Sequence, residues 1–323
     1  MRRYGLVILL FPLSLFIIGV EAAEQYPVKP ITCIVPNEAG SDADILARPI
    51  MQKASALLGK PIIIVNKVGA ASSTGYREVF GAKADGYTIG MGHAALIISK
   101  LQGILPIDHR DFTVLGTYAT FIPIIVASTK TQRPFGSIQE VISFAKAHPG
   151  EVSIATTGVG GSWWVATLAF QDGTGLKFNV IPQMGGGSFS ITQVAGGHTD
   201  LAVLALAAAK SQIEAGNVRF IAIFGSKKAP GYENVPTLKE IGYNISWSST
   251  QILIAPPKLP QEISEKLVYT FEKAANDPEY KKFVVERTAI PLYLPPDQAV
   301  NYFNEQRVVV RGIMEKTGIL KEK

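Results

Sequence analysis

Two stretches of this 323-residue chain follow one design, in which an apolar strand runs into a turn of glycine and small polar residues and a helix begins directly afterwards. The first is the strand Ile31–Val35 with the turn 37–41, and the second is the strand 152–155 with the turn 157–162. Glycine exposes backbone N–H groups to a ligand, and the unpaired amides and dipole of a helix start favour a negative group. Two such turns that face each other across a cleft would bind a small organic anion.

Acidic side chains near the first turn oppose this interpretation. Asp42 and Asp44 lie in the first helical turn, and Glu38 adds a third negative charge nearby. Ser41 and Asp44 have the spacing of a capping box, which predicts a helix start near residue 41 with or without a ligand. The anionic group must then be held by amides that point away from these side chains, or Glu38 must meet a donor elsewhere on the ligand.

A third turn, Gly185-Gly186-Gly187, follows the predicted strand 179–182 and resembles a phosphate loop in glycine content only. No Gly-Lys-Ser/Thr sequence follows it. Met184 and Gly185 are candidates for the same cleft, although Met184 fits equally well in a core. Other glycines, Gly69 among them, are interpreted as turn residues rather than ligand contacts.

Trp163 and Trp164 open the second helix. Large aromatic side chains mostly pack into cores, but one that faces the ligand would favour an apolar or aromatic ligand body. Adjacent helix positions cannot point in the same direction, so the two interpretations stay open for this pair.

The chain displays little that could catalyse a reaction. His93, His109, His148 and His198 have no helical histidine partner, no Gly-x-Ser-x-Gly elbow occurs, and Cys33 is the single cysteine. We therefore expect no enzyme, no catalytic residue, no bound metal and no cofactor. His93 ends a predicted strand, from which it could reach a cleft.

The N-terminus indicates export. Arg2 and Arg3 precede an uncharged apolar run over 4–20, which ends in small residues typical of a signal peptidase site. This pattern predicts a cleaved signal peptide over 1–22 and a periplasmic mature protein from Ala23. A membrane anchor is the competing interpretation, but no basic cluster follows the apolar run.

Composition argues against a nucleic-acid partner. The formal net charge is +5, the hydrophobic content is 47%, and basic residues are scattered without a stripe, a zinc-finger pattern or a helix-turn-helix pattern. A weak positive field of this kind helps to gather anions.

Strand-like and helix-like runs alternate between residues 31 and 225, which predicts an α/β fold with parallel sheets covered on both faces. The predicted strands are Ile31–Val35, 62–65, 87–91, 152–155, 179–182, 201–204 and 220–224. The predicted helices are 45–58, 74–82, 138–147, 164–172, 188–195, 207–215, 261–276, 279–286 and 297–316.

Two long extended stretches, 112–128 and 245–255, interrupt this alternation. We expect them to be crossings between two domains. Domain 1 then comprises 23–121 plus 252–323, and domain 2 comprises 122–251. Two crossings make a hinge, and ligands of hinged proteins lie between the domains.

A family resemblance is carried by motifs spread in order along the mature chain. They are YPVKPI at 26–31, IVP at 34–36, Gly40-x-x-x-Asp44, VN at 65–66 with GA at 69–70, ADGYT at 84–88, TGVG-x-S at 157–162, VPT at 235–237 and AP at 255–256. The pattern resembles the Bug/TctC family, the periplasmic solute-binding proteins of tripartite tricarboxylate transporters.

The resemblance implies a two-domain periplasmic-binding-protein fold, or Venus flytrap, that closes on a small carboxylate. Backbone amides and water from the turns 37–41 and 157–162 would hold the carboxylate. It also implies a monomer that delivers its ligand transiently to a two-subunit membrane permease. The candidate ligand-binding residues are Asn37, Glu38, Ala39, Gly40, Ser41, His93, Thr157, Gly158, Val159, Gly160, Gly161, Ser162, Trp163, Trp164, Met184, Gly185, Ala205 and Gln251.

The chain departs from the family pattern at positions that bear on the ligand. Gly40-Ser41 replaces a paired glycine, and Glu38 replaces a small or apolar residue. Trp164 stands where many members have His, and Ala205 where several have an Asp that meets an amino or hydroxyl group. These departures disfavour an amino acid and favour a less polar carboxylate, an aromatic one included.

The leading hypothesis is therefore a binding protein without catalysis, in which the ligand shifts the population toward a closed form. An exported hydrolase or lyase that uses the same cleft is the alternative from another class. A sensor subunit that reports ligand occupancy to a membrane signalling partner is a further alternative with the same fold.

Overall fold

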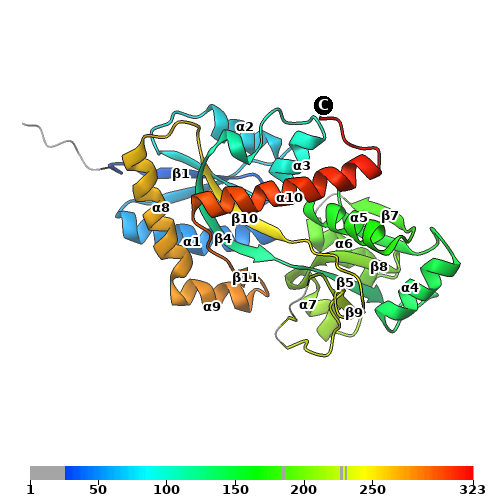
Figure 1. Ribbon diagram of the computed structural model, residues 1–323. Helices are drawn as coiled ribbons and strands as arrows, with labels where there is room; N and C mark the ends of the chain where they lie inside the picture. The colour runs from blue at the N-terminus through cyan, green and yellow to red at the C-terminus, as the bar shows by residue number, and fades with distance from the viewer. Residues whose placement is uncertain (1–25, 184–185, 226–227, 230, 323) are drawn as a thin grey trace, which may run out of the picture.

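The computed structural model describes residues 26–183, 186–225, 228–229 and 231–322, which form two lobes that are each built on one β-sheet (Figure 1). The predicted signal peptide, residues 1–22, lies outside the described residues. Within the described part of the chain, none of the helices is long and apolar enough to cross a membrane.

Six strands form the sheet of the first lobe in the described residues. Their order is β11 (Ile290–Pro291), β4 (Thr113–Phe121), β10 (Ser249–Ala255), β3 (Thr88–Gly92), β1 (Ile31–Val35) and β2 (Ile62–Asn66). β1 pairs in parallel with β2 and β3. Four of the five residues of β1 are buried, as expected for a strand covered on both faces.

Helices cover both faces of this sheet. They are α1 (Asp42–Leu58), α2 (Ser73–Gly81), α3 (Ala95–Leu101), α8 (Gln261–Asn276), α9 (Pro278–Glu286) and α10 (Pro296–Lys316), with a 3₁₀ helix at His109–Asp111. α1 buries Leu46, Ile50 and Ala54, which lie four residues apart on one face, and packs against α8.

The second lobe is built in the same manner. Its sheet has the order β7 (Asn179–Gln183), β6 (Ser153–Thr157), β8 (Leu201–Ala205), β5 (Pro123–Ser128) and β9 (Val218–Ile223). Its helices are α4 (Ile138–Ala147), α5 (Ser162–Thr174), α6 (Gly186–Ala195) and α7 (Leu206–Glu214).

Both sheets are mixed, which corrects the prediction of parallel sheets. β10 runs antiparallel to β3 and β4, and β5 runs antiparallel to β8 and β9. The reason is that β5 and β10 are the strands that follow the crossings, so each enters its sheet from the other lobe instead of through a helix on its own lobe.

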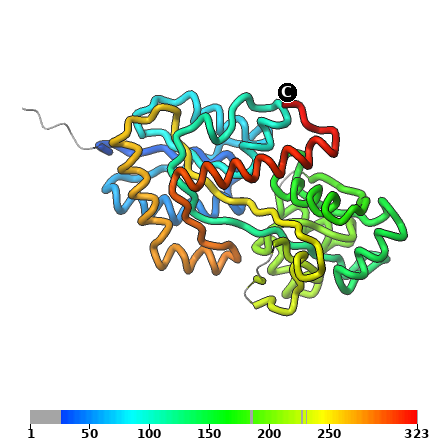
Figure 2. The backbone as a smooth tube through the Cα atoms, in the orientation of Figure 1, coloured from blue at the N-terminus to red at the C-terminus, as the bar shows by residue number. Residues whose placement is uncertain are grey.

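The chain passes from the first sheet to the second between Phe121 and Pro123, and β10, which begins at Ser249, is again part of the first sheet. Figure 2 shows these two segments running side by side between the lobes. We retain 23–121 with 252–323 and 122–251 as the proposed domain division.

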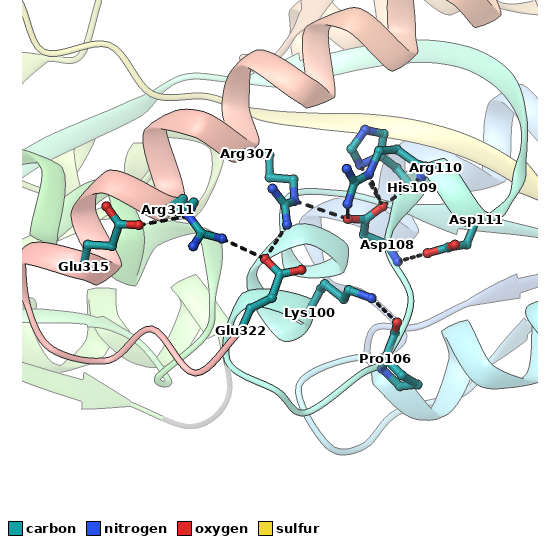
Figure 3. Close-up of polar contacts among 10 residues, drawn as sticks. All are labelled: Lys100, Pro106, Asp108, His109, Arg110, Asp111, Arg307, Arg311, Glu315 and Glu322. Carbon is teal, nitrogen blue, oxygen red and sulfur yellow. Dashed lines mark hydrogen bonds and ion pairs between the residues drawn. The ribbon is translucent and has the colours of Figure 1, made fainter.

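An ion-pair cluster ties helix α10 to the first lobe (Figure 3). The carboxylate of the buried Asp108 lies 2.6 Å from Arg110 Nη2 and 3.3 Å from Arg307 Nε. Glu322 pairs with Arg307 and lies 3.1 Å from Arg311 Nη1. Burial by itself would raise the pKa of Asp108, but its bonds to Arg110 outweigh burial and hold the pKa below the usual value.

The C-terminal end of α10, next to this cluster, contacts the second lobe. Lys316 Nζ lies 2.8 Å from the carboxylate of Asp172 on α5. Beyond it, the amide of Glu322 donates to the Leu101 carbonyl at 3.0 Å and so returns the chain to the first lobe. α10 is therefore a third connection between the lobes (Figure 1).

Candidate functional site

A cavity of about 480 Å³ lies between the two lobes. Segments from the N-terminal ends of helices and from the crossing strands form its wall. It is lined by Pro36, Asn37, Glu38, Ala39, Gly40, Ser41, Asp42, Ala43, Val68, Gly69, Ala70, Ala71, Ser72, His93, Ala95, Phe121, Thr157, Gly158, Val159, Gly160, Gly161, Ser162, Trp163, Gln183, Gly186, Gly187, Ser188, Ser249 and Gln251.

The first turn uses much of its own hydrogen-bonding capacity. Ser41 caps α1, because its Oγ accepts from the amide of Asp44 at 3.4 Å. The Asp44 carboxylate accepts from the Gly40 amide at 2.9 Å rather than from that of Ser41, whose amide donates to the Glu38 carbonyl. The amides of Gly40, Ser41 and Asp44 are therefore occupied within the turn.

Asp44 also has cationic and amide partners. Arg48 Nε and Asn66 Nδ2 each lie 2.9 Å from its carboxylate. Burial by itself would raise the pKa of Asp44, but the bonds from Arg48, Asn66 and Gly40 outweigh it and hold the pKa below the usual value. The ionised carboxylate therefore compensates the positive end of the α1 dipole.

The second turn is built differently. Thr157 Oγ1 accepts from the Trp164 amide at 3.2 Å, and the Gly161 amide donates to the Gly158 carbonyl at 2.8 Å. Gly161 is required here because a Cβ on it would lie 2.3 Å from Thr157 Oγ1. Helix α5 has no acidic residue in its first turn, and the amides of its first two residues, Ser162 and Trp163, have no intrahelical acceptor.

The two helix starts therefore differ in charge. α1 has two acidic residues in its first turn, whereas α5 has none. An anion in the cavity is favoured by the dipole and free amides of α5 and repelled by the acidic side chains of α1. This difference in charge favours an anion at the turn 157–162 over the turn 37–41.

The turn between β2 and α2, residues 69–72, also lines the cavity, and the sequence analysis did not predict this. Ala70, Ala71 and Ser72 all have left-handed backbones, with φ of 45°, 54° and 70°. Ser99 Oγ supports the turn by donating to the Ala71 carbonyl at 3.1 Å. Such strained conformations gather at ligand sites. The signal was the strand–turn–helix pattern of β2 and α2, but Gly69 had been interpreted as a turn residue only.

His93 contributes a neutral imidazole to the cavity wall. Burial lowers its pKa to about 4, so the ring is uncharged at neutral pH. Its Nδ1 accepts from the Ala95 amide at 3.2 Å, which leaves the proton on Nε2. His93 therefore offers a single hydrogen-bond donor.

Acceptors occupy other parts of the first-lobe wall. Glu38 and Asp42 line the cavity, and burial raises the pKa of Asp42 to about 6. Gln251 on β10 is 2% exposed, and its amide oxygen has no partner among the described residues. The lining contains no Lys or Arg in the part of the chain that the structure describes.

The structure brings most of the predicted site residues together. Those that line the cavity are Asn37, Glu38, Ala39, Gly40, Ser41, His93, Thr157, Gly158, Val159, Gly160, Gly161, Ser162, Trp163 and Gln251. Met184 and Gly185 lie outside the described residues.

Two predicted residues do not line the cavity. Trp164 is buried behind the wall, so Trp163 is the member of the pair that faces the cavity. Ala205 is fully buried at the start of α7. The absence of a carboxylate at Ala205 therefore does not limit the polarity of the ligand. The sequence analysis used Ala205 as one reason to expect a weakly polar ligand, and the structure does not support that reason.

Several lining residues were not among the candidates. Asp42 had been considered only as an obstacle to an anion. Gly186 and Gly187 belong to the glycine turn that the sequence did single out, and Ser188 follows it. The remaining ones are Pro36, Ala43, Val68, Gly69, Ala70, Ala71, Ser72, Ala95, Phe121, Gln183 and Ser249. Across the described ranges, no three His, Cys, Asp or Glu side chains gather in a way that could hold a metal ion.

Comparisons with known proteins agree with this architecture. Residues 46–319 match the family described as "Tripartite tricarboxylate transporter family receptor". The chain is 27% identical to protein BugT of Bordetella pertussis, with 98% of each chain covered. A TctC solute-binding protein from Polaromonas, solved without ligand, superposes with a TM-score of 0.75 at 25% identity and covers 90% of this chain and 99% of its own. R. palustris Rpa4515, solved with adipate, gives a TM-score of 0.80 at 24% identity, with 91% and 99% covered.

Proposed function

Because this chain belongs to the tripartite tricarboxylate transporter receptor family, a family of periplasmic solute-binding proteins and not of enzymes, we propose that it captures a small organic carboxylate between its two lobes. We further propose that it is exported by the signal peptide 1–22 and delivers the ligand to a two-subunit membrane permease. The alternative of an exported hydrolase or lyase is set aside with the family assignment.

One observation carries the proposal. The N-terminus of α5 lines the cavity, its first turn has no acidic residue, and the amides of Ser162 and Trp163 have no acceptor among the described residues. A carboxylate placed there receives backbone hydrogen bonds and the favourable end of the helix dipole. Charge-assisted bonds of this type are stronger than neutral ones.

The rest of the wall suits a carbon body. Val68 and Phe121 of the first lobe and Val159 and Trp163 of the second all line the cavity. An aromatic ring such as that of Trp163 provides a large apolar face. R. palustris Rpa4515, the structural neighbour solved with adipate, is an example of this fold together with a small carboxylate.

Binding would work through a population shift. The cavity wall is shared by both lobes, so a ligand makes its full set of contacts only when the lobes are closed. A ligand with this difference in affinity stabilises the closed form. The same mechanism would serve a sensor subunit, and a pull-down of the membrane partner separates sensing from transport.

A thermal-shift titration tests the proposal. A ligand that binds only the folded protein at 100 times its Kd adds about 2.7 kcal/mol to the free energy of unfolding, which raises Tm by several degrees. We expect members of a broad carboxylate panel to raise Tm, and the amines and alcohols of equal size not to do so. A panel in which only ligands without a carboxylate raise Tm would refute the proposal.

A further inference from the structure

The start of α5 is hydrogen-bonded to a side chain that lies outside the cavity wall. Trp247 Nε1 donates to Ser162 Oγ at 3.1 Å, and both side chains are buried. Ser162 is the first residue of α5 and lines the cavity, whereas Trp247 is not part of the lining. The indole therefore contacts the proposed ligand site without forming part of its wall.

The chemistry of the indole fixes the direction of this hydrogen bond. An indole N–H can only donate, so Ser162 Oγ is the acceptor and the hydroxyl proton is left for another partner. That proton has no acceptor among the described residues, and the same is true of the Ser162 amide. Ser162 therefore offers two donors at the start of α5. A hydroxyl that accepts a hydrogen bond is also a stronger donor.

Trp247 lies in the return crossing between the lobes (Figure 2). On the second-lobe side, the Ile245 carbonyl accepts from the Gly225 amide at 3.0 Å, just beyond β9. On the first-lobe side, Gln306 Nε2 on α10 donates to the Ser248 carbonyl at 3.2 Å, and β10 begins at the next residue. Residues 246 and 247 separate these two anchored positions, so a rotation of the lobes that uses this crossing changes the backbone at Trp247.

We propose that Trp247 is a positioning residue for the ligand site. From the return crossing, its indole holds the Ser162 hydroxyl with the proton free to bond the ligand carboxylate. The crossing and the ligand site are thereby linked through one hydrogen bond. This inference rests on the proposed function and adds a residue that sets affinity through Ser162 without touching the ligand.

Isothermal titration calorimetry with succinate, malate, adipate, phenylacetate and mandelate tests the inference. For each of these acids that binds the wild type, Trp247→Phe should weaken binding about five- to tenfold, because it keeps an aromatic ring but removes the donor. Ser162→Ala should weaken binding at least as much. The double variant should bind at most about twofold more weakly than Ser162→Ala, because the indole acts through the hydroxyl.

Ile245→Val is the matched control for packing. Ile245 lies in the same crossing, is 6% exposed and packs against α5 at Gly173, where a Cβ would lie 2.4 Å from Ile245 Cγ1. Removal of one methyl group should lower stability in urea denaturation. It should leave the affinity within about twofold of the wild type, because no hydrogen bond to Ser162 is lost.

NMR of the tryptophan side chains, labelled with ¹⁵N, supplies a measurement that packing alone would not change. The chain has three tryptophans, so the spectra of Trp163→Phe and Trp164→Phe identify the Trp247 indole signal by elimination. Ser162→Ala should move the indole proton of Trp247 upfield, because the substitution removes its acceptor. A bound acid should move this proton downfield by more in the wild type than in Ser162→Ala. This measurement needs no Trp247 variant, so it tests the inference even if Trp247→Phe does not fold.

The outcomes separate this inference from the proposed function. If acids bind but Trp247→Phe stays within about twofold of the wild type, the inference is wrong and the proposed function stands. The same holds if the two single losses multiply in the double variant, if Ile245→Val loses as much affinity as Trp247→Phe, or if the Trp247 signal is unchanged in Ser162→Ala. If none of these acids binds the wild type, the proposed function itself fails, and the inference fails with it.

Discussion

Substituting Gly160 by Ala should weaken ligand binding by preventing full closure of the lobes. Gly160 belongs to the second-lobe turn and has a φ of +90°. A Cβ at this position would lie 2.7 Å from Gln102 Oε1 and 3.8 Å from Ala71 Cβ, both on the first lobe. Gln102 is 8% exposed and its amide oxygen has no partner among the described residues, so the lobes meet here with little room.

The expected magnitude has two parts. An alanine in the left-handed region costs about 1–2 kcal/mol whether the lobes are open or closed. The contact at 2.7 Å arises only when the lobes are closed, and moving the end of Gln102 off its rotamer costs about 1 kcal/mol more. Because 1.4 kcal/mol is a factor of ten, affinity should fall by about five- to tenfold in addition to the loss of stability.

Gly175→Ala is the matched control. Gly175 ends helix α5 with a φ of +67°, and a Cβ there meets nothing within 4 Å. It should lose similar stability in urea denaturation but no affinity in calorimetry. Adding Gln102→Ala to Gly160→Ala should restore most of the affinity, which makes a double-mutant cycle.

Two results would refute this reasoning. Equal affinity losses for Gly160→Ala and Gly175→Ala would show that backbone strain alone acts. A double variant that binds as weakly as Gly160→Ala would show that Gln102 is not the group that the new methyl meets.

Three further predictions concern the carboxyl groups of Asp44, Asp108 and Asp42, of which the first two are buried. Asp44→Asn removes the charge that bonds Arg48 and compensates the dipole of α1. The free energy of unfolding at pH 7, measured by urea denaturation, should therefore fall by about 2–4 kcal/mol. A change below about 0.5 kcal/mol would contradict the bonding described. Asp108→Asn should cost about 3 kcal/mol by the same assay. Because the folded pKa of Asp108 is lowered, its contribution to stability is present above the unfolded pKa of about 4 and is lost as pH falls through the folded pKa. If the wild type were still more stable than Asp108→Asn by the same amount at pH 2, this reasoning would be wrong. The sign of the effect reverses for Asp42, because its folded pKa is raised to about 6 and its ionisation above that pH opposes folding. Asp42→Asn should therefore raise Tm at pH 8, by an amount that corresponds to about 1–3 kcal/mol of unfolding free energy. It should have no such effect below pH 4. A variant with lower Tm at pH 8 would show that the charge of Asp42 stabilises the ligand-free protein.

Local patterns were sufficient to predict much of the fold. The bounds of β1, α4 and α8 match the predicted ranges, because a continuous apolar run, a Ser cap or an amphipathic period marks each of them within its own sequence. The two extended stretches indicated the two crossings for the same reason. α3 was missed because its buried sequence, Ala95–Leu101, is short and apolar on nearly every side and has no clear period.

The site was predictable only in outline. The glycine turns led to the prediction of two helix starts at a ligand site, and both of them line the cavity. The Asp44 carboxylate that occupies the Gly40 amide is also held by Arg48 of its own helix and by Asn66, whose side chain reaches Asp44 only after β2 has paired with β1. Local sequence does not contain that pairing.

Tertiary structure alone decided the remaining features of the cavity. It selected Trp163 over Trp164, excluded Ala205, and brought the strained turn at Ala70–Ser72 and the buried Gln251 to the same cavity. The sequence by itself determined the family, much of the order of the elements and the two turns that we propose as the ligand site. The first-lobe wall of the cavity is formed by residues that lie far apart in the chain. Only long-range packing makes these residues neighbours.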